Sequence, residues 1–293
     1  MAQFQADIVI GKLKWAFPDI DVQKCIISAD ADKHEGSLMR EGGKGAFVSR
    51  LDHALVQREL DIAVNCLKDI PNSHERQTGI IVAGVLARDE VIDVAITRTG
   101  APLKDLPPNS TVGTVAPRRI AQVTRNYPQL KCVHFRGSAD TRIAKLDAGA
   151  VDAVILASSG LERIGMRDRA TEELPEDVFP PAFGAGVVTM DCLAERQEIK
   201  AVIQQLNHEE TQRCMDAERA FVNAIYGNCA TAMAGIAKCD EENRTCLRVV
   251  LYSHDGKAQL KGQDCCVQGK EIEMGKNLAM SMESKGSKRI MQL

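Results

Sequence analysis

The chain has 293 residues, of which 44% are hydrophobic and 26% are charged, and its formal net charge is −3. These proportions are ordinary for a globular protein and exclude a disordered or fibrous chain, and the length predicts two or three domains. The negative net charge argues against bulk nucleic-acid binding, and no apolar run approaches the roughly 18 residues of a membrane span. The N-terminus has no signal-peptide pattern, so we expect a cytoplasmic protein without nucleic-acid or membrane partners.

The first part of the chain is expected to alternate helices and strands. A helix is predicted over residues 2–17, where apolar side chains recur at helical spacing before a proline. A Gly-Gly-Lys-Gly turn at 42–45 precedes the next helix, so Lys44 either contacts an anion at the helix start or belongs to an exposed turn. The other elements expected before residue 111 are strands at 22–28, 61–67, 79–87 and 91–97, a helix at 47–60 and a linker to a second domain at 100–110.

The strand at 61–67 ends at Lys68 and Asp69. Residues at the carboxyl end of a parallel strand are placed where open α/β sheets bind ligands. A solvated turn before Pro71 is the alternative interpretation of this charged pair.

From residue 110 strands and helices alternate regularly, which predicts a parallel sheet covered by helices. Seven Lys or Arg residues stand against one Asp between Gly113 and Lys145. Arg118 and Arg119 open a helix after a strand, and two further arginines, Arg136 and Arg142, repeat the arrangement. Because acidic residues are almost absent among these arginines, we expect them to face a small polyanion. The elements are strands at 110–116, 131–135 and 151–157, and helices at 118–127, 139–148 and through 161.

The last part of the chain predicts a return to the first domain and then a small α+β domain. A Gly-rich turn and strand over 180–192 make the return, and two helices at 194–206 and 208–225 lead to Cys229. The remaining elements are strands at 230–238, 246–253 and 258–267, a hairpin turn at 254–256 and a helix at 271–284.

Cysteine and histidine spacing excludes several kinds of site. Ten cysteines and six histidines are scattered, and no cysteines form a C-x-x-C pair. We therefore expect no zinc site, no redox dithiol and no Ser-His-Asp arrangement, and most cysteines reduced and buried. Cys229 differs because it follows a Gly-Asn turn, where a thiol is accessible for a covalent attachment, although a packed cysteine is the commoner outcome.

Seven segments of the chain together resemble one enzyme family. They are GGKGAFVSRLDHAL, DIAVNCLKDIP, VGTVAPRR, FRGSADTRIAKLDAGAVDAVILASSGLERIG, LNHEET, AERAF and YGNC. In this order and at these separations they resemble hydroxymethylbilane synthase, also called porphobilinogen deaminase, over essentially the whole chain. The fold implied is two periplasmic-binding-protein-like (type II) α/β domains plus a small C-terminal α+β domain. The implied limits are 1–86 with 187–205, then 92–181, then 208–293.

The resemblance implies a transferase of tetrapyrrole and heme biosynthesis that joins four porphobilinogen molecules head to tail and releases ammonia. A dipyrromethane cofactor would be held by a thioether to Cys229, and Asp69 would stabilise positive charge on pyrrole nitrogens. The implied partners are porphobilinogen and the growing polypyrrole, bound by a monomer. Residues implied to pair with their carboxylates are Lys44, Lys68, Arg118, Arg119, Arg136, Arg142 and Arg163.

Several polar positions depart from the family pattern. The chain begins at the end of the family's R-x-S-x-L-A motif, so the first strand and its arginine are expected to be absent. A Thr-Ser-Ser run before Arg118 reads Val-Ala-Pro at 115–117, and Asn228 replaces a glycine before Cys229. These changes leave a second hypothesis open, a non-catalytic relative that binds pyrroles or polycarboxylates or acts as an interaction protein.

Overall fold

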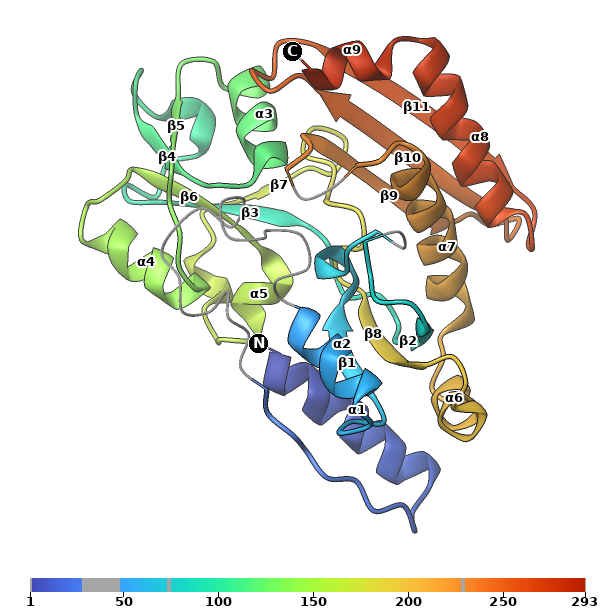
Figure 1. Cartoon of the computed structure of the whole chain (residues 1–293). Helices are drawn as coiled ribbons and strands as arrows, with labels where there is room; N and C mark the ends of the chain where they lie inside the picture. The colour runs from blue at the N-terminus through green and yellow to red at the C-terminus, as the bar shows by residue number, and fades with distance from the viewer. Residues whose placement is uncertain (1, 28–47, 73–74, 228–229, 293) are drawn as a thin grey trace.

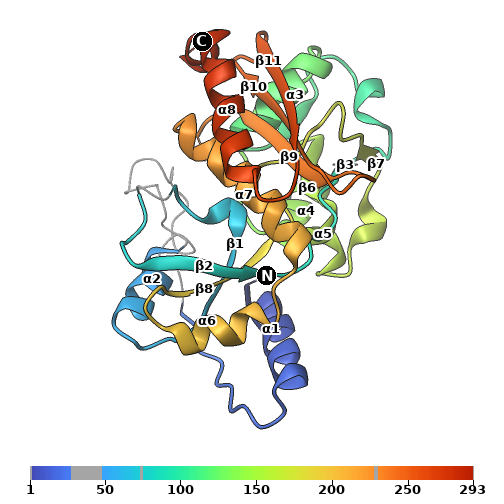
Figure 2. The same ribbon diagram turned by 90° about the vertical axis from the view of Figure 1, so that its right-hand side faces the viewer.

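The computed structural model describes residues 2–27, 48–72, 75–227 and 230–292. Lys44 and Cys229 lie outside these ranges. The described chain forms three sheets with helices packed against each of them (Figures 1 and 2). Among the described residues, no helix combines the length and apolar character needed to cross a lipid bilayer.

The first sheet has the strand order β1-β8-β2 and is antiparallel throughout. Its elements are β1 (Ala63–Cys66), β2 (Ile80–Val85), β8 (Val188–Leu193), α1 (Ala2–Ala16), α2 (Ser49–Val56) and α6 (Gln197–Gln204). Alternate residues of β8 face opposite sides. Met190 packs in an apolar core with Leu13 of α1 and Ile203 of α6. Asp191, from the other face of β8, is fully buried.

Two sequence expectations fail in this region. Residues 22–27 contain no strand, and Ile26 is 65% exposed, so this stretch lacks the burial that would favour a core strand. The strand before Lys68 is present as β1, but it pairs antiparallel with β8 rather than in a parallel sheet. Asp69 therefore follows the end of an antiparallel strand.

The second sheet has the order β5-β4-β6-β3-β7 and is mixed rather than parallel. Strands β5, β4 and β6 run parallel to one another, whereas β3 runs antiparallel to both of its neighbours. One face packs on α3 and the other on α4 and α5. The elements are β3 (Asp93–Thr97), β4 (Thr111–Gly113), β5 (Lys131–Val133), β6 (Ala153–Ala157), β7 (Glu172–Leu174), α3 (Pro117–Asn126), α4 (Ala139–Asp147) and α5 (Ser158–Glu162).

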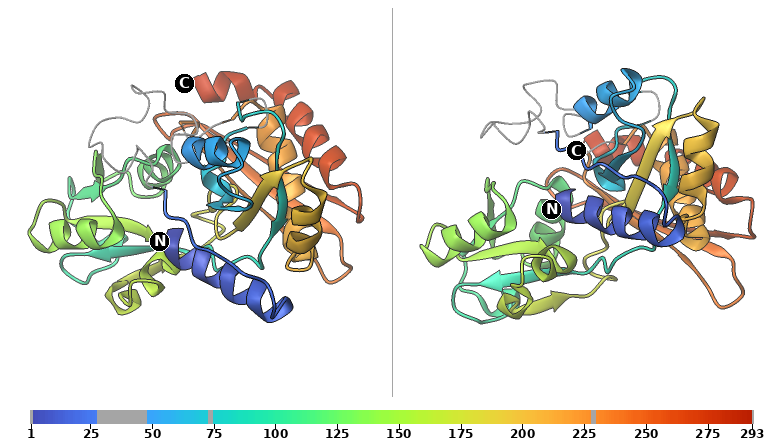
Figure 3. Two further views of the ribbon diagram at one scale, coloured as in Figure 1. Left: turned by 60° about the horizontal axis from the view of Figure 1, so that its bottom comes forward. Right: turned by 90° about the horizontal axis from the view of Figure 1, so that it is seen from below.

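The expected linker at 100–110 is wrong, because β3 and β4 lie on either side of it in one sheet. The chain crosses from the first sheet to the second before β3 and returns between β7 and β8. Prolines and glycines at 100–110 mark a loop within the second sheet. Figure 3 shows the N-terminal end of α1 reaching towards this sheet.

The third sheet is an antiparallel meander, β11-β10-β9, and the expected α+β organisation of the C-terminal part is confirmed. Helices α7 and α8 cover one face, with Phe221, Leu247 and Met274 in the shared core. The other face meets α3, where Tyr252 packs near Ala121. The elements are α7 (Glu209–Ala224), β9 (Met233–Cys239), β10 (Thr245–Tyr252), β11 (Gln259–Cys266), α8 (Glu271–Ser284) and α9 (Ser287–Gln292).

Most of the described cysteines are free, as expected, but two form a disulfide and few of the free ones are buried. Cys246 and Cys265 are directly opposed on β10 and β11 and form a disulfide. Of the free cysteines in the described ranges, Cys192 and Cys214 are buried and Cys25 is exposed. Strand register brings the bonded pair together, and a separation of 19 residues without a motif gives no sign of it.

Candidate active site between the sheets

Asp69 lies on a short 3-10 helix, η2 (Leu67–Asp69), directly after β1. Leu67 is buried and anchors this turn, whereas Lys68 is exposed and Asp69 is half-buried. Burial raises the pKa of the Asp69 carboxyl, and the positive charge of Lys68 partly opposes the rise. No ion pair to Asp69 occurs among the described residues. The arrangement presents a partly desolvated carboxylate, which responds strongly to any positive charge placed beside it.

The third sheet's helix holds the loop that follows Asp69. Arg219 of α7 donates to the carbonyl oxygens of Ile70 at 2.9 Å and Pro71 at 2.6 Å. The buried amide of Asn72 donates to the carbonyl oxygen of Gly227 at 2.7 Å. Gly227 precedes Cys229 by two residues in the chain. The structure thus joins the Asp69 loop to the segment that leads to the expected attachment residue, although Cys229 itself lies outside the described ranges.

Arg163 approaches the same region from the second sheet. Its guanidinium forms an ion pair with Asp89 and lies 6.0 Å from the ring centre of Phe4. Burial raises the pKa of the Cys66 thiol, Asp69 raises it further, and the charges of Lys68 and Arg163 oppose the rise. Because all three charges act on this one thiol at the end of β1, Asp69, Lys68 and Arg163 share one neighbourhood.

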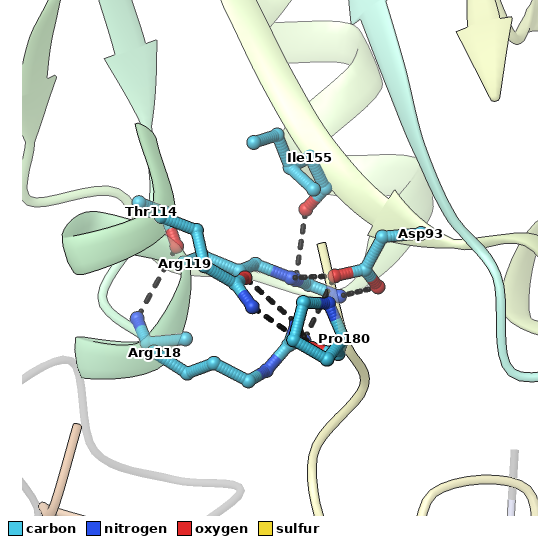
Figure 4. Close-up of polar contacts among 8 residues, drawn as sticks. Asp93, Thr114, Arg118, Arg119, Ile155 and Pro180 are labelled. Carbon is cyan, nitrogen blue, oxygen red and sulfur yellow. Dashed lines mark hydrogen bonds and ion pairs between the residues drawn. The ribbon is translucent and has the colours of Figure 1, made fainter. Parts of the chain in front are cut away.

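Arg118 and Arg119 both converge on Asp93 (Figure 4). From the first turn of α3, Arg118 Nη2 lies 2.8 Å from Asp93 Oδ2, and Arg119 Nη2 lies 2.7 Å from Asp93 Oδ1. Arg119 Nε also donates to Asp93 Oδ2 at 3.0 Å. Burial alone would raise the pKa of Asp93, but the two arginines outweigh it and hold the pKa well below its ordinary value. The expectation that acidic residues are almost absent around Arg118 and Arg119 is wrong, because both arginines pair with Asp93.

Arg136 and Arg142 form the second part of the basic lining, and both are half-buried. Arg142 Nε donates to the carbonyl oxygen of Gly137 at 2.7 Å. Burial lowers the pKa of Arg142, and the positive charges of Arg119 and Arg136 lower it further. The structure therefore places Arg142 close enough to Arg119 and Arg136 for both of them to repel its charge.

The chain between β7 and β8, called the return segment below, contacts both the start of α3 and the turn that carries Asp69. The carbonyl oxygen of Pro180 accepts hydrogen bonds from Arg118 at 3.0 Å and from Gln122 at 2.8 Å. Four residues later Gly184, at φ +70°, lies against η2, and a Cβ there would come 2.8 Å from the backbone nitrogen of Lys68. A side chain at this position would both strain the backbone and displace the Asp69 turn.

A buried carboxylate on α7 secures this return segment. Glu218 is 1% exposed; its Oε2 accepts from the backbone nitrogen of Gly184 at 2.7 Å. Its Oε1 accepts from Arg88 Nη2 at 2.7 Å and from the nitrogen of Ala237 at 2.8 Å. One side chain therefore ties together the first crossing, the second crossing and β9.

The sequence did not predict a role in the candidate site for three residues that hold it together: Asp93, Arg219 and Asn72. Asp93 could have been noticed, because it is the one charged residue in the apolar stretch VIDVAIT, and a charge on a buried strand needs a partner. Arg219 lies within the AERAF segment that carries the resemblance, but nothing in that segment indicates that its partners are carbonyls. In the described part of the chain, no group of His, Cys, Asp or Glu side chains is arranged to hold a metal ion.

Known proteins and family models match this chain over almost its whole length. Residues 1–201 match the family model "Porphobilinogen deaminase, dipyromethane cofactor binding domain", and residues 212–284 match "Porphobilinogen deaminase, C-terminal domain". Porphobilinogen deaminase 2 of Streptomyces coelicolor is 34% identical over 290 residues, covering 99% of this chain and 93% of that protein. The Staphylococcus carnosus porphobilinogen deaminase is 32% identical over 292 residues, covering 99% and 94%.

Among solved structures, the periplasmic VFT2 domain of Bordetella pertussis BvgS aligns with a TM-score of 0.40 and 18% identity, covering 68% of this chain and 75% of that one. The family models and the curated relatives, by contrast, reach from the first residues to the last helices of the chain. The chain therefore belongs to the porphobilinogen deaminase family.

Proposed function

We propose that this protein is a hydroxymethylbilane synthase, which condenses four porphobilinogen molecules head to tail with release of ammonia. The reaction belongs to tetrapyrrole biosynthesis, and the family's cofactor-binding and C-terminal models both match the chain. The observation that carries the proposal for the site is the link between the Asp69 loop and Gly227, two residues before Cys229. This link supports one catalytic centre that contains both Asp69 and Cys229.

The basic residues suit a cofactor and substrates that are rich in carboxylates. Arg119 and Arg136 both repel the charge of Arg142, and carboxylates placed among the three would relieve that repulsion. Lys68 and Arg163 would serve the ring nearest Asp69, and Lys44 and Arg118 complete the proposed set. Dipyrromethane, attached through a thioether to Cys229, supplies the primer on which the polypyrrole grows.

Asp69 would act electrostatically on the pyrrole that reacts. When the C–N bond of the aminomethyl group breaks, ammonia leaves with the bonding electrons and positive charge develops on the pyrrole. A fixed carboxylate stabilises that charge as it forms and needs no reorganisation at that moment. Because burial has already removed part of the water around Asp69, its charge is screened less than that of an exposed carboxylate.

The first test is an intact mass measurement combined with a turnover assay. We expect the purified protein to be heavier than its sequence by one dipyrromethane, to colour with Ehrlich's reagent in acid and to consume porphobilinogen. Cys229→Ser should lose both the mass increment and the turnover. A protein of unmodified mass that leaves porphobilinogen intact would instead favour the non-catalytic relative.

The chain offers a matched control for Asp69. The sequence Leu-Lys-Asp occurs twice as a 3-10 helix, at η2 and again at η3 (Leu103–Asp105). Asp69→Ala should reduce turnover at least about 10²-fold, the scale of losing one electrostatic stabiliser, while the cofactor mass increment remains. Asp105→Ala, at the same place in the second copy, should leave turnover unchanged. Equal activity of the two variants would remove Asp69 from the mechanism.

We also propose that the protein works as a cytoplasmic monomer, in keeping with the role of the family. Light scattering after size-exclusion chromatography at working concentration should give the mass of one chain plus cofactor. A stable dimer mass would contradict this part of the proposal.

A further inference from the structure

Arg219 directs a guanidinium at the backbone of the Asp69 loop. Its two described acceptors are the neutral carbonyl oxygens of Ile70 and Pro71, at 2.9 and 2.6 Å. Burial and the nearby charge of Arg76 lower the pKa of Arg219 to about 10, while Asp191 opposes the shift. Removing a cation from water in order to bind two carbonyls costs free energy. Such an arrangement indicates that the position of these carbonyls matters.

The same loop is held at two further points. Asn72, 4% exposed, donates to the carbonyl oxygen of Gly227 at 2.7 Å, beyond the end of α7. On its other side η2 lies against Gly184, whose nitrogen donates to Glu218. Glu218 and Arg219 are adjacent on α7, so neighbouring residues of one helix hold the loop and the segment packed against it.

We infer that Arg219 and Asn72 are positioning residues for Asp69: they hold its loop on α7 so that the carboxylate keeps one place while the pyrrole chain grows. The inference rests on the proposed function in one respect, the role of Asp69 as the catalytic carboxylate. Neither residue needs to touch the substrate. Electrostatic stabilisation depends on a fixed geometry, and a displacement of about 1 Å can cost on the order of 10²-fold in rate.

Arg219→Gln is the principal variant, and Arg213→Gln is its control. Arg213 lies six residues earlier on α7 and also donates to an oxygen pair, the carbonyl and side-chain oxygens of Asn243 at 3.2 and 2.6 Å. We expect Arg219→Gln to lower kcat by roughly 10- to 100-fold with KM changed less than about threefold, because the loss is in geometry rather than in binding. Arg213→Gln should keep wild-type kcat. Arg219→Lys should recover part of kcat, since one ammonium can reach one of the two carbonyls.

Hydrogen exchange provides a readout that does not depend on turnover. In the holoprotein, Arg219→Gln should speed exchange of the amides over 67–72, whereas Arg213→Gln should leave them at the wild-type rate. If Arg219→Gln does not fold, Asn72→Ala should show the same selective fall in kcat and the same faster exchange.

The outcomes separate the two proposals. If the wild type turns over and both Arg219→Gln and Asn72→Ala keep the wild-type kcat, the positioning role is overturned and the proposed function stands. An equal fall in Arg213→Gln would also overturn it, because the effect would then belong to α7 as a whole. If the wild type itself has no turnover, the proposed function fails, and the exchange rates alone decide whether Arg219 holds the loop.

Discussion

Two groups of arginines that lie beside the second sheet have different electrostatic surroundings. The paired arginines, Arg118 and Arg119, share the carboxylate of Asp93, whose side chain is 4% exposed. The clustered arginines, Arg136 and Arg142, are half-buried, and Arg142 donates to a neutral carbonyl. At Asp93 one carboxylate offsets part of the positive charge of two arginines, whereas the pKa of Arg142 is lowered by burial and by its positive neighbours.

The comparison separates two tasks that look alike in the sequence. A buried ion pair leaves an uncompensated charge in the interior when one partner is lost, so Asp93, which holds both arginines, should matter mainly for folding. Repulsion between like charges is relieved when an anion binds, so Arg142 should matter mainly for the ligand. Arg119 belongs to both, because it contacts Asp93 and also repels Arg142.

Removing Asp93 should have the largest effect on stability. Asp93→Ala leaves two largely buried guanidinium groups without their carboxylate, and we expect a loss of about 3–5 kcal/mol in the free energy of unfolding. Urea unfolding followed by circular dichroism measures it. The exposed Asp105→Ala should change stability by less than about 0.5 kcal/mol. A loss at Asp93 no larger than at Asp105 would remove the distinction between the two groups.

Arg142→Gln should show the reverse pattern. We expect KM for porphobilinogen to rise roughly tenfold, equivalent to about 1.4 kcal/mol, because one carboxylate partner of the ligand is lost. The free energy of unfolding should change by less than about 0.5 kcal/mol, since a repulsion is removed together with one hydrogen bond. Steady-state kinetics and urea unfolding of the same preparation test both halves. A large loss of stability with unchanged KM would reverse the assignment.

The loss of folding stability at acid pH should distinguish the two groups of arginines by a smaller effect. The pKa of Asp93 is lowered in the folded protein, so its contribution is present above the unfolded value, about 3.9, and is lost as pH falls below that value through the folded pKa. Between about pH 4 and pH 2 the wild type should therefore lose more stability than Asp93→Asn, whose side chain does not titrate. Thermal unfolding across this range measures the difference. Parallel pH curves for the two proteins would show that Asp93 is not held by the arginines.

Local sequence patterns predicted the elements of this chain well where one face of an element is apolar. The last long helix, α8, has the bounds 271–284 that its pattern predicts, and the alternation of elements after residue 110 appears in β4, α3, β5, α4 and β6. The patterns failed where the structure depends on which strands pair with one another. The direction of β1, the place of the 100–110 loop and the Cys246–Cys265 bond all depend on strands far apart in the sequence.

The candidate site divides in the same way. Residue order, the charged turn at Lys68 and Asp69 and the run of arginines were enough to indicate the family and an acidic ligand, because motifs and local charge are properties of short segments. Only the tertiary structure decided which charges are already paired within the protein and which loop is held by α7. Asp93 meets Arg118 across 25 positions, and Arg219 reaches Ile70 across 149. Hydrogen bonds and ion pairs act over a few ångströms in space, so separations of this size along the chain conceal them until the chain has folded.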